Sequence, residues 1–153
     1  MASSDVMKVS LRDVEDDDLE MFHAFEQDPE AVRRSRFPAR ERERFMTHWR
    51  ERILGDPGTF VQTVTADGAP AGNIVSWWDG ERRFLGYWLG REFWGRGVGT
   101  QALELFLRAE PIRPLYADPH EGNTASVRLL ERLGFRREGV SEGHVTLVLD
   151  KPR

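Results

Sequence analysis

Three glycines at alternate positions form the part of the sequence best suited to chemistry, in the segment Trp94-Gly95-Arg96-Gly97-Val98-Gly99-Thr100. The segment lies between a predicted strand at 82–89 and a predicted helix at 97–109. Glycine has no Cβ to hold a ligand away from the backbone. The first turn of a helix carries unpaired N–H groups at the positive end of the helix dipole, and such groups bind phosphates. We therefore predict that the backbone from Arg96 to Thr100 binds a pyrophosphate.

The same glycines permit two other interpretations. They can serve a chain reversal alone, and residues 97–102 also fit the G-x-G-x-x-A form of a dinucleotide-binding fingerprint. That fingerprint is a weak signal by itself. Here it lies past the middle of a short chain, which leaves no room for the second half of a doubly wound sheet. An oxidoreductase with a nucleotide cofactor is therefore the weaker alternative.

Ser126 places a hydroxyl group on a helix face that should be buried. In the helix predicted at 123–133 it shares a face with Leu129, Leu130 and Leu133, which should pack inward. A hydroxyl on that face needs a hydrogen-bond partner, and a carbonyl of the preceding helical turn is one alternative. Asn123 opens the same helix, where it acts as an N-cap, as a ligand contact, or as both.

His120 is the candidate for accepting a proton. It lies just after a predicted strand at 115–118, and imidazole titrates in the range that a general base needs. The alternative is a solvated loop histidine, and Asp79, Glu81 and Glu121 are weaker candidates for the same role. The histidines of the chain show no paired spacing of metal ligands, so we predict no metal site.

Periodicity and turn residues predict the elements that position these groups. Strands are expected at 6–12, 59–65, 71–78, 82–89, 115–118, 135–140 and 144–149. Helices are expected from the acidic turn after residue 12 to about residue 27, and then at 38–54, 97–109 and 123–133. This order predicts an α/β fold of the mixed α+β kind, in which helices pack on a sheet.

Two features of the central strands leave alternatives open. Gly86 marks either a bulge that lets a ligand approach the strand or a site of packing against an aromatic ring. Trp77 and Trp78 are neighbours in a predicted strand and point to opposite faces, so at least one of them leaves the core. That one is a candidate for the wall of a substrate pocket.

Composition limits the classes of protein that this chain can represent. Its 153 residues, 39% hydrophobic and 31% charged, fit a single folded domain over 1–153. The net charge of -4 argues against a nucleic-acid-binding surface. No apolar run is long enough to cross a membrane, and no signal peptide is recognisable. The absence of cysteine excludes disulfides and thiolate nucleophiles. We expect a cytoplasmic protein.

Two motifs in the expected order resemble a known family. The run Gly86-Tyr87-Trp88-Leu89 followed by Trp94–Gly99 resembles the acetyl-CoA motif of the GNAT superfamily, especially the branch of ribosomal-protein N-terminal acetyltransferases. The run Asn123-Thr124-Ala125-Ser126-Val127-Arg128-Leu129-Leu130-Glu131-Arg132-Leu133-Gly134-Phe135 resembles the second signature of that branch. Together the motifs cover about residues 82–138.

The resemblance implies a fold and a cofactor site. It implies a mostly antiparallel sheet of about six to seven strands, with a central parallel pair and helices on both faces. Coenzyme A is expected to contact Trp88 and Leu89, the segment Trp94 to Thr100, and Asn123 and Ser126. Leu89 is assigned to the pantetheine arm and Arg96 to Thr100 to the pyrophosphate. Ser126 is expected near the sulfur atom, where it protonates the departing thiolate.

The resemblance also implies an activity, with one departure from the family pattern. The expected reaction transfers an acetyl group from acetyl-CoA to a primary amine, either a peptide N-terminus or a small molecule, by direct attack. Dimerisation is implied by the resemblance alone. Many relatives have a glutamate directly before the Leu-Gly-Tyr run, whereas this chain has Phe84. The general base therefore stays unassigned, and an acyl-CoA-binding module without catalysis is the second alternative.

Overall fold

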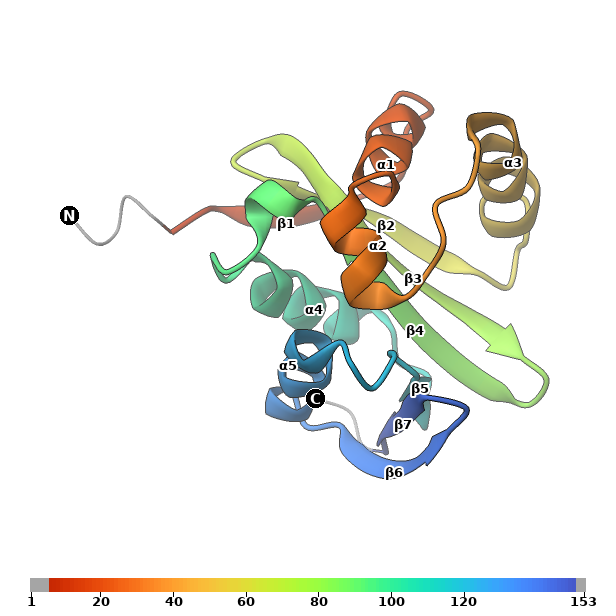
Figure 1. Ribbon diagram of the computed structural model, residues 1–153, viewed down its shortest axis with the longest axis vertical. Coiled ribbons are helices and arrows are strands. Elements are labelled where there is room, and N and C mark those ends of the chain that lie inside the picture. The colour runs from red at the N-terminus through yellow and green to blue at the C-terminus, as the bar shows by residue number, and fades with distance from the viewer. Residues whose placement is uncertain (1–5, 151–153) are drawn as a thin grey trace.

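The computed structural model describes residues 6–150, which form one sheet with helices packed on it (Figure 1). The strands are β1 (Val9–Arg12), β2 (Phe60–Ala66), β3 (Ala69–Asp79), β4 (Arg82–Leu89), β5 (Leu115–Ala117), β6 (Arg136–Ser141) and β7 (His144–Leu149). They form a 7-stranded sheet in the order β1-β2-β3-β4-β5-β7-β6. The pair β4–β5 is parallel and the other pairs are antiparallel. The predicted mixed sheet with a central parallel pair is confirmed.

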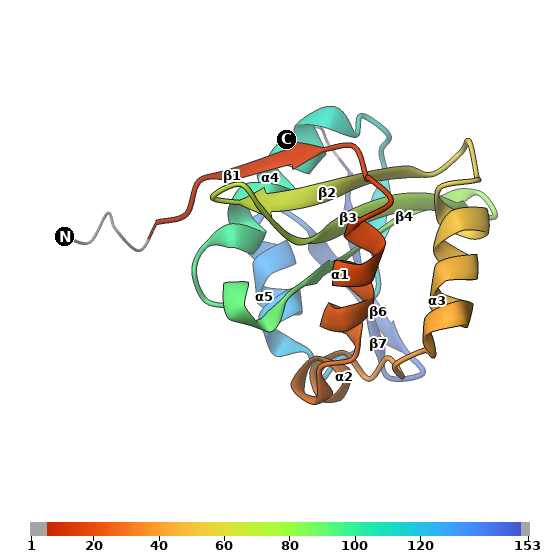
Figure 2. The same ribbon diagram turned by 90° about the horizontal axis from the view of Figure 1, so that it is seen from above.

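Helices cover both faces of this sheet. They are α1 (Asp18–Glu26), α2 (Pro29–Ser35), α3 (Arg42–Thr47), α4 (Val98–Ala109) and α5 (Thr124–Arg132), with a π-helix at His48–Ile53 and a 3₁₀ turn at Arg91–Phe93. In Figure 2, α1 and α4 lie on opposite sides of the strands, where α1 packs on β3 and β4 and α4 packs on β1 and β2. The prediction that helices cover both faces of the sheet is confirmed.

The region between the first and second strands differs most from the sequence-based prediction. The helix expected at 38–54 begins only at Arg42, and its second half is a π-helix. Its predicted apolar face is nevertheless present, because Phe45 and Trp49 are buried. The separate helix α2 was not predicted. Its start is encoded by Asp28, whose side chain accepts a hydrogen bond from Glu30 N–H, followed by proline at the first helical position.

Strands β4 and β5 separate soon after they pair. Their register joins only Arg83 to Leu115 and Phe84 to Tyr116, while β4 continues to Leu89. The closed end of the pair is held by a buried cluster in which Glu110 Oε1 accepts hydrogen bonds from Arg83 Nε at 2.9 Å and from Ser76 Oγ at 2.5 Å. The open end gives ligands access to the edge of β4.

Candidate active site

A cavity of about 450 Å³ occupies the open end of β4. It is lined by residues from β4, the loop that follows, the first turn of α4, and the facing sides of α2 and α5. Most of the residues predicted to bind coenzyme A line it, namely Trp88, Leu89, Trp94, Gly95, Gly97, Val98, Gly99, Thr100, Asn123 and Ser126. Arg96 is exposed and does not line this cavity.

The glycine loop presents bare backbone N–H groups to this cavity. Gly95 and Gly97 have φ angles of 70° and 77°, a left-handed conformation that glycine adopts without strain. The first hydrogen bond of α4 runs from Gln101 N–H to the Gly97 carbonyl at 3.1 Å, and no side chain in the described part of the chain caps this end. The N–H groups of the first turn therefore remain available to an anion.

Gly99 is required for close packing as well as for ligand approach. A Cβ at this position would lie 3.1 Å from Leu129 Cδ2 and 3.4 Å from Leu89 Cδ1. These two leucines belong to α5 and β4, the walls of the cavity. A side chain at residue 99 would therefore push the walls apart or enter the space beside them.

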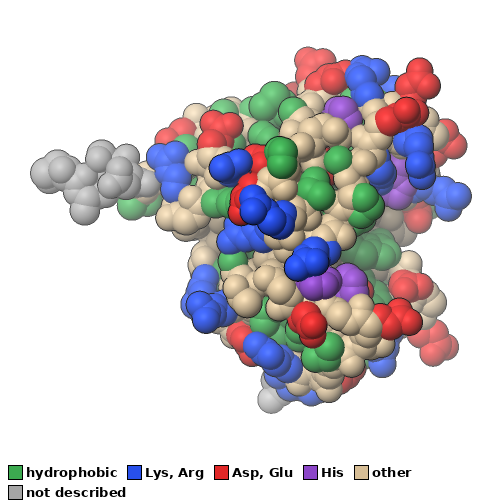
Figure 3. Space-filling view, viewed as in Figure 1, with side chains coloured by type: hydrophobic (Ala, Val, Ile, Leu, Met, Phe, Trp, Pro, Cys, Tyr) green, Lys and Arg blue, Asp and Glu red, His purple; other side chains and the backbone are tan. Residues whose placement is uncertain are grey.

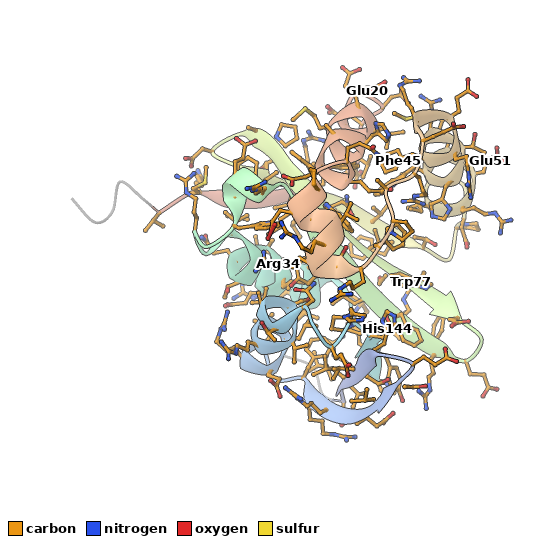
Figure 4. All side chains as sticks on the ribbon, in the orientation of Figure 1. Glu20, Arg34, Phe45, Glu51, Trp77 and His144 are labelled. Atoms are coloured by element: carbon orange, nitrogen blue, oxygen red, sulfur yellow. The ribbon has the colours of Figure 1, made fainter. Side chains whose placement is uncertain are left out.

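Two arginines at this cavity were missed by the sequence analysis. Arg34 from α2 places its guanidinium 4.2 Å from the ring centroid of Trp94, whose Nε1 donates to the Leu89 carbonyl at 3.1 Å. Arg132 lines the cavity from the end of α5. Figure 4 shows Arg34 at the centre of this face of the molecule. The Asp28-Pro29 helix start was the signal that could have placed Arg34 on a helix.

The residues present fit a phosphate-containing cofactor. This cavity combines the bare N–H groups of α4 with two cationic side chains, Arg34 and Arg132, which suits a diphosphate. Trp88 Nε1 is buried beside the same cavity and has no hydrogen-bond partner among the described residues. A buried donor without a partner is unfavourable, and an acceptor on a bound ligand would satisfy it.

Ser126 is held by a tyrosine of the facing strand. Ser126 is buried on α5, as predicted, and its Oγ lies 2.9 Å from the phenolic oxygen of Tyr87 on β4. The partner is therefore a side chain of the sheet. Asn123 is the N-cap of α5, because its Oδ1 accepts a hydrogen bond from Ser126 N–H at 3.4 Å. Asn123 also lines the cavity, so both of its predicted roles are compatible with the structure.

A second, larger cavity of about 610 Å³ meets the first one. The two share five lining residues, namely Ser35, Tyr87, Trp88, Asn123 and Ser126. The larger cavity extends from this junction between α3 on one side and the ends of β5 and β7 on the other. The space-filling view is hollowed between the same two parts of the molecule (Figure 3). Two ligands can therefore meet at Tyr87 and Ser126.

His120 lines the larger cavity together with His144. The two rings pack edge to face with centroids 5.6 Å apart. His120 Nδ1 accepts a hydrogen bond from Gly122 N–H at 3.0 Å, so a neutral His120 ring carries its proton on Nε2. His144 Nδ1 donates to the Asp118 carbonyl at 2.9 Å, so a neutral His144 ring has a free lone pair on Nε2. The sequence analysis did not single out His144.

Gly86 packs directly against the ring of Trp77 on the neighbouring strand. A Cβ at Gly86 would lie 3.2 Å from the Trp77 ring, so glycine is there for packing against an aromatic side chain, and β4 pairs with β3 without a register shift. Trp77 is half-buried and Trp78 is exposed, and both line the larger cavity. The expectation that one of these tryptophans leaves the core is confirmed.

Comparison with known proteins identifies the family of this domain. The sequence model of the acetyltransferase (GNAT) domain matches residues 8–136. The chain belongs to the GNAT acetyltransferase family. Membership confirms the predicted acetyltransferase acting on amino groups, and a GNAT sheet with one parallel pair does not fit the doubly wound fold of the oxidoreductase alternative. A comparison with curated proteins gives no significant sequence match.

Solved GNAT structures share the fold at low sequence identity. An aminoglycoside acetyltransferase, AAC(6')-Ib, in complex with coenzyme A is 22% identical with a TM-score of 0.78, covering 94% of this chain and 95% of that one. RimL, a ribosomal alpha-N-protein acetyltransferase in complex with coenzyme A, is 19% identical with a TM-score of 0.74, covering 94% of each chain. Spermidine N-acetyltransferase from Vibrio cholerae, in complex with coenzyme A and spermine, is 14% identical with a TM-score of 0.76, covering 92% of each chain.

Two other kinds of site are absent from the described residues. Between residues 6 and 150, no helix combines the length and the apolar character needed to cross a bilayer. The same residues contain no group of three or more histidine, cysteine, aspartate and glutamate side chains that could hold a metal ion.

Proposed function

We propose that this GNAT domain transfers an acetyl group from acetyl-CoA to a primary amine by direct attack, with both substrates bound together. The junction of the two cavities carries this proposal. The smaller cavity offers phosphate-binding groups, the larger one has room for an acceptor, and Ser126 and Tyr87 line both. The chain has no cysteine, so an acyl-enzyme thioester is not available as an intermediate.

The residues of the smaller cavity would bind and orient the donor. The N–H groups at the start of α4, with Arg34 and Arg132, would hold the diphosphate, and the unpaired edge of β4 near Leu89 would pair with the pantetheine arm. A free N–H on the same edge would stabilise negative charge on the acetyl oxygen. When bound, acetyl-CoA supplies an activated acetyl group and a thiolate leaving group.

Ser126, oriented by Tyr87, would protonate the leaving thiolate. As the amine nitrogen bonds to the carbonyl carbon and the carbon–sulfur bond breaks, Ser126 Oγ would donate a proton to the thiolate sulfur and regain one from the amine nitrogen, which restores its hydroxyl. Burial raises the pKa of Tyr87, so its phenol remains protonated at neutral pH and can donate to Ser126 Oγ. The hydrogen bond with Tyr87 would therefore also hold the Ser126 side chain in position.

The pair of histidines, His120 and His144, would accept the proton that the amine substrate loses before its nitrogen attacks. An alkylammonium must lose a proton before its nitrogen can attack. Within the larger cavity, the free Nε2 lone pair of a neutral His144 suits acceptance, whereas His120 presents an N–H there. The family glutamate is replaced by Phe84, and this pair offers a physical alternative. The Nε2 N–H of His120 would then help to orient the amine substrate or a water molecule bound beside it.

One experiment tests the proposal. The purified protein is incubated with acetyl-CoA and a panel of primary amines, and the free thiol released is measured alongside coenzyme A binding by calorimetry. We expect turnover with at least one amine, and Ser126→Ala should lower kcat at least about tenfold while changing the Kd for coenzyme A less than about twofold. Tight coenzyme A binding without any thiol release would favour the non-catalytic module instead.

A further inference from the structure

We propose that the larger cavity takes a monoamine with an aromatic or flat apolar body, and not a polycation such as a polyamine or an aminoglycoside. This inference deepens the proposed function and rests on it. Three observations carry it: the aromatic walls of the cavity, the internal neutralisation of its buried carboxylate, and a charge balance in the lining that matches one ammonium group.

Aromatic side chains form a large part of the walls of this cavity. Six of them are Phe37, Phe45, Trp77, Trp78, Tyr87 and Trp88. Phe37 and Trp78 are 43% and 49% exposed, and both lie at the same cavity although large apolar side chains are usually covered. In Figure 4, Trp77 and His144 mark the side of the cavity away from Phe45. A flat apolar ligand would cover these rings and gain from stacking on them.

The buried carboxylate of the cavity is already paired inside the protein. Glu26 is 4% exposed, and its oxygens accept hydrogen bonds from Arg40 Nε at 3.0 Å, Arg40 Nη2 at 2.8 Å and the Arg40 backbone N–H at 3.1 Å. A ligand ammonium would have to displace an arginine bound at three points to reach it. Glu26 therefore offers little to a cationic substrate.

A second arginine lies on the α3 side of the cavity. Arg52 lines it and forms no ion pair with any residue between 6 and 150. Burial, followed by the charges of Arg40 and Arg52, lowers the pKa of His48 in the same wall. The charges of these two arginines also disfavour a second or third ligand ammonium on this side of the cavity.

With Glu26 paired to Arg40, the lining also holds two other carboxylates, and Arg52 balances one of them, which leaves a negative charge that suits one ligand ammonium. Asp56 is exposed, and its Oδ1 accepts a hydrogen bond from Gly58 N–H at 2.8 Å. Asp118 also lines the cavity, and partial burial of its carboxyl group raises its pKa. One ammonium can be accommodated near the histidine pair, whereas several would lose hydration without matching carboxylates. We therefore do not expect this protein to share the amine substrates named for AAC(6')-Ib and for the spermidine acetyltransferase, although it shares their fold.

The test compares acceptors at one pH and saturating acetyl-CoA. The panel is phenethylamine, n-butylamine, spermidine, kanamycin and a hexapeptide with a free N-terminal serine, and thiol release gives kcat/KM for each. We expect phenethylamine to exceed n-butylamine, spermidine, kanamycin and the peptide by about tenfold or more, because the flat body adds stacking on the walls.

Matched variants link the preference to the cavity. Trp78→Ala should lower kcat/KM for phenethylamine about fivefold to tenfold and leave that for n-butylamine and the Kd for coenzyme A within about twofold. Met21→Ala serves as the control, because Met21 is 40% exposed on α1 and lines neither cavity. Arg52→Glu should raise kcat/KM for spermidine several-fold, because it replaces a cation by a carboxylate.

The outcomes separate this inference from the proposed function. Turnover in which spermidine, kanamycin or the peptide equals or exceeds phenethylamine would overturn the inference and leave the acetyltransferase proposal intact. The inference also fails if Trp78→Ala and Met21→Ala behave alike with phenethylamine. Failure to bind coenzyme A in calorimetry, together with no thiol release from any amine, would overturn the proposed function itself.

Discussion

The phenolic oxygen of Tyr87 lies 2.9 Å from Ser126 Oγ, and this hydrogen bond joins β4 to α5 where the two cavities meet. Burial raises the pKa of Tyr87 more than the Ser126 hydroxyl lowers it, so the phenol stays a donor at neutral pH. If Tyr87 orients Ser126 by donating to its Oγ, Tyr87→Phe should lower kcat about tenfold to a hundredfold while the KM for acetyl-CoA changes less than about threefold.

Steady-state kinetics of thiol release check this prediction. Tyr116→Phe is the control, since Tyr116 lies on β5 and lines neither cavity. Its kcat should remain within about twofold of the wild-type value. A Tyr87→Phe enzyme that kept full kcat and lost only acetyl-CoA affinity would show that Tyr87 serves in binding alone.

Gly99→Val should greatly weaken cofactor binding. The new side chain would meet Leu129 and Leu89 at contact distances of 3.1 and 3.4 Å from its Cβ and would cover the N–H groups of the first α4 turn. We expect the Kd for coenzyme A to rise at least about a hundredfold in calorimetry, because several charge-assisted hydrogen bonds to phosphate are lost.

Gly139→Val provides the matched comparison. A Cβ at Gly139 would meet nothing within 4 Å, and this residue lies on the exposed strand β6. The Kd of the Gly139→Val protein for coenzyme A should equal that of the wild type. Equal affinity of the Gly99→Val protein would remove the glycine loop from the cofactor site.

The sheet and the glycine loop were predictable because local sequence determines them. Alternating apolar residues, the Asp67-Gly68 turn and the Asn123 cap each act over a few residues. In the structure Asp67 and Gly68 both have positive φ, as a two-residue hairpin turn requires, and Asn123 caps α5. The order of elements then restricted the topology to a mixed sheet.

The rest of the candidate site depends on contacts between residues far apart in sequence. Tyr87 and Ser126 are brought together by the separation of β4 from β5, and His144 reaches His120 through a bridge between distant segments. No periodicity encodes such pairs. Arg34 was missed for a different reason, since α2 is only one short helix with few buried residues to signal it.

Asp18 should make the fold sensitive to acid. Burial opposes its ionisation, but hydrogen bonds from Arg12, the Glu15 backbone and Thr63 outweigh it and lower the pKa of Asp18 below its ordinary value of 3.8. A carboxyl with a lowered pKa in the folded state contributes stability above the unfolded-state value. That contribution is lost as pH falls through the folded-state value.

Asp18→Asn should therefore reduce the free energy of unfolding by about 1–3 kcal/mol at pH 7 and by much less at about pH 2. Urea unfolding followed by circular dichroism at both pH values measures the difference. Asp17→Asn is the control, because Asp17 is exposed and makes no side-chain capping bond. A destabilisation that is the same at neutral and acid pH would mean that Asp18 acts through packing and not through its charge.

Glu110 should contribute strongly to the stability of the fold. Its carboxylate is 2% exposed and accepts from Arg83 and Ser76, both buried at the closed end of the β4–β5 pair. Glu110→Ala would leave the Arg83 guanidinium buried without its counter-charge, which costs about 3–5 kcal/mol. Chemical denaturation gives this value, and Asp150→Asn, which breaks an exposed pair with Arg136, should cost less than about 1 kcal/mol.

Because the cluster lies outside both cavities, we expect kcat of the folded Glu110→Ala protein at low temperature to stay near the wild-type value. A large fall in kcat without loss of stability would show instead that the cluster sets the separation of β4 from β5.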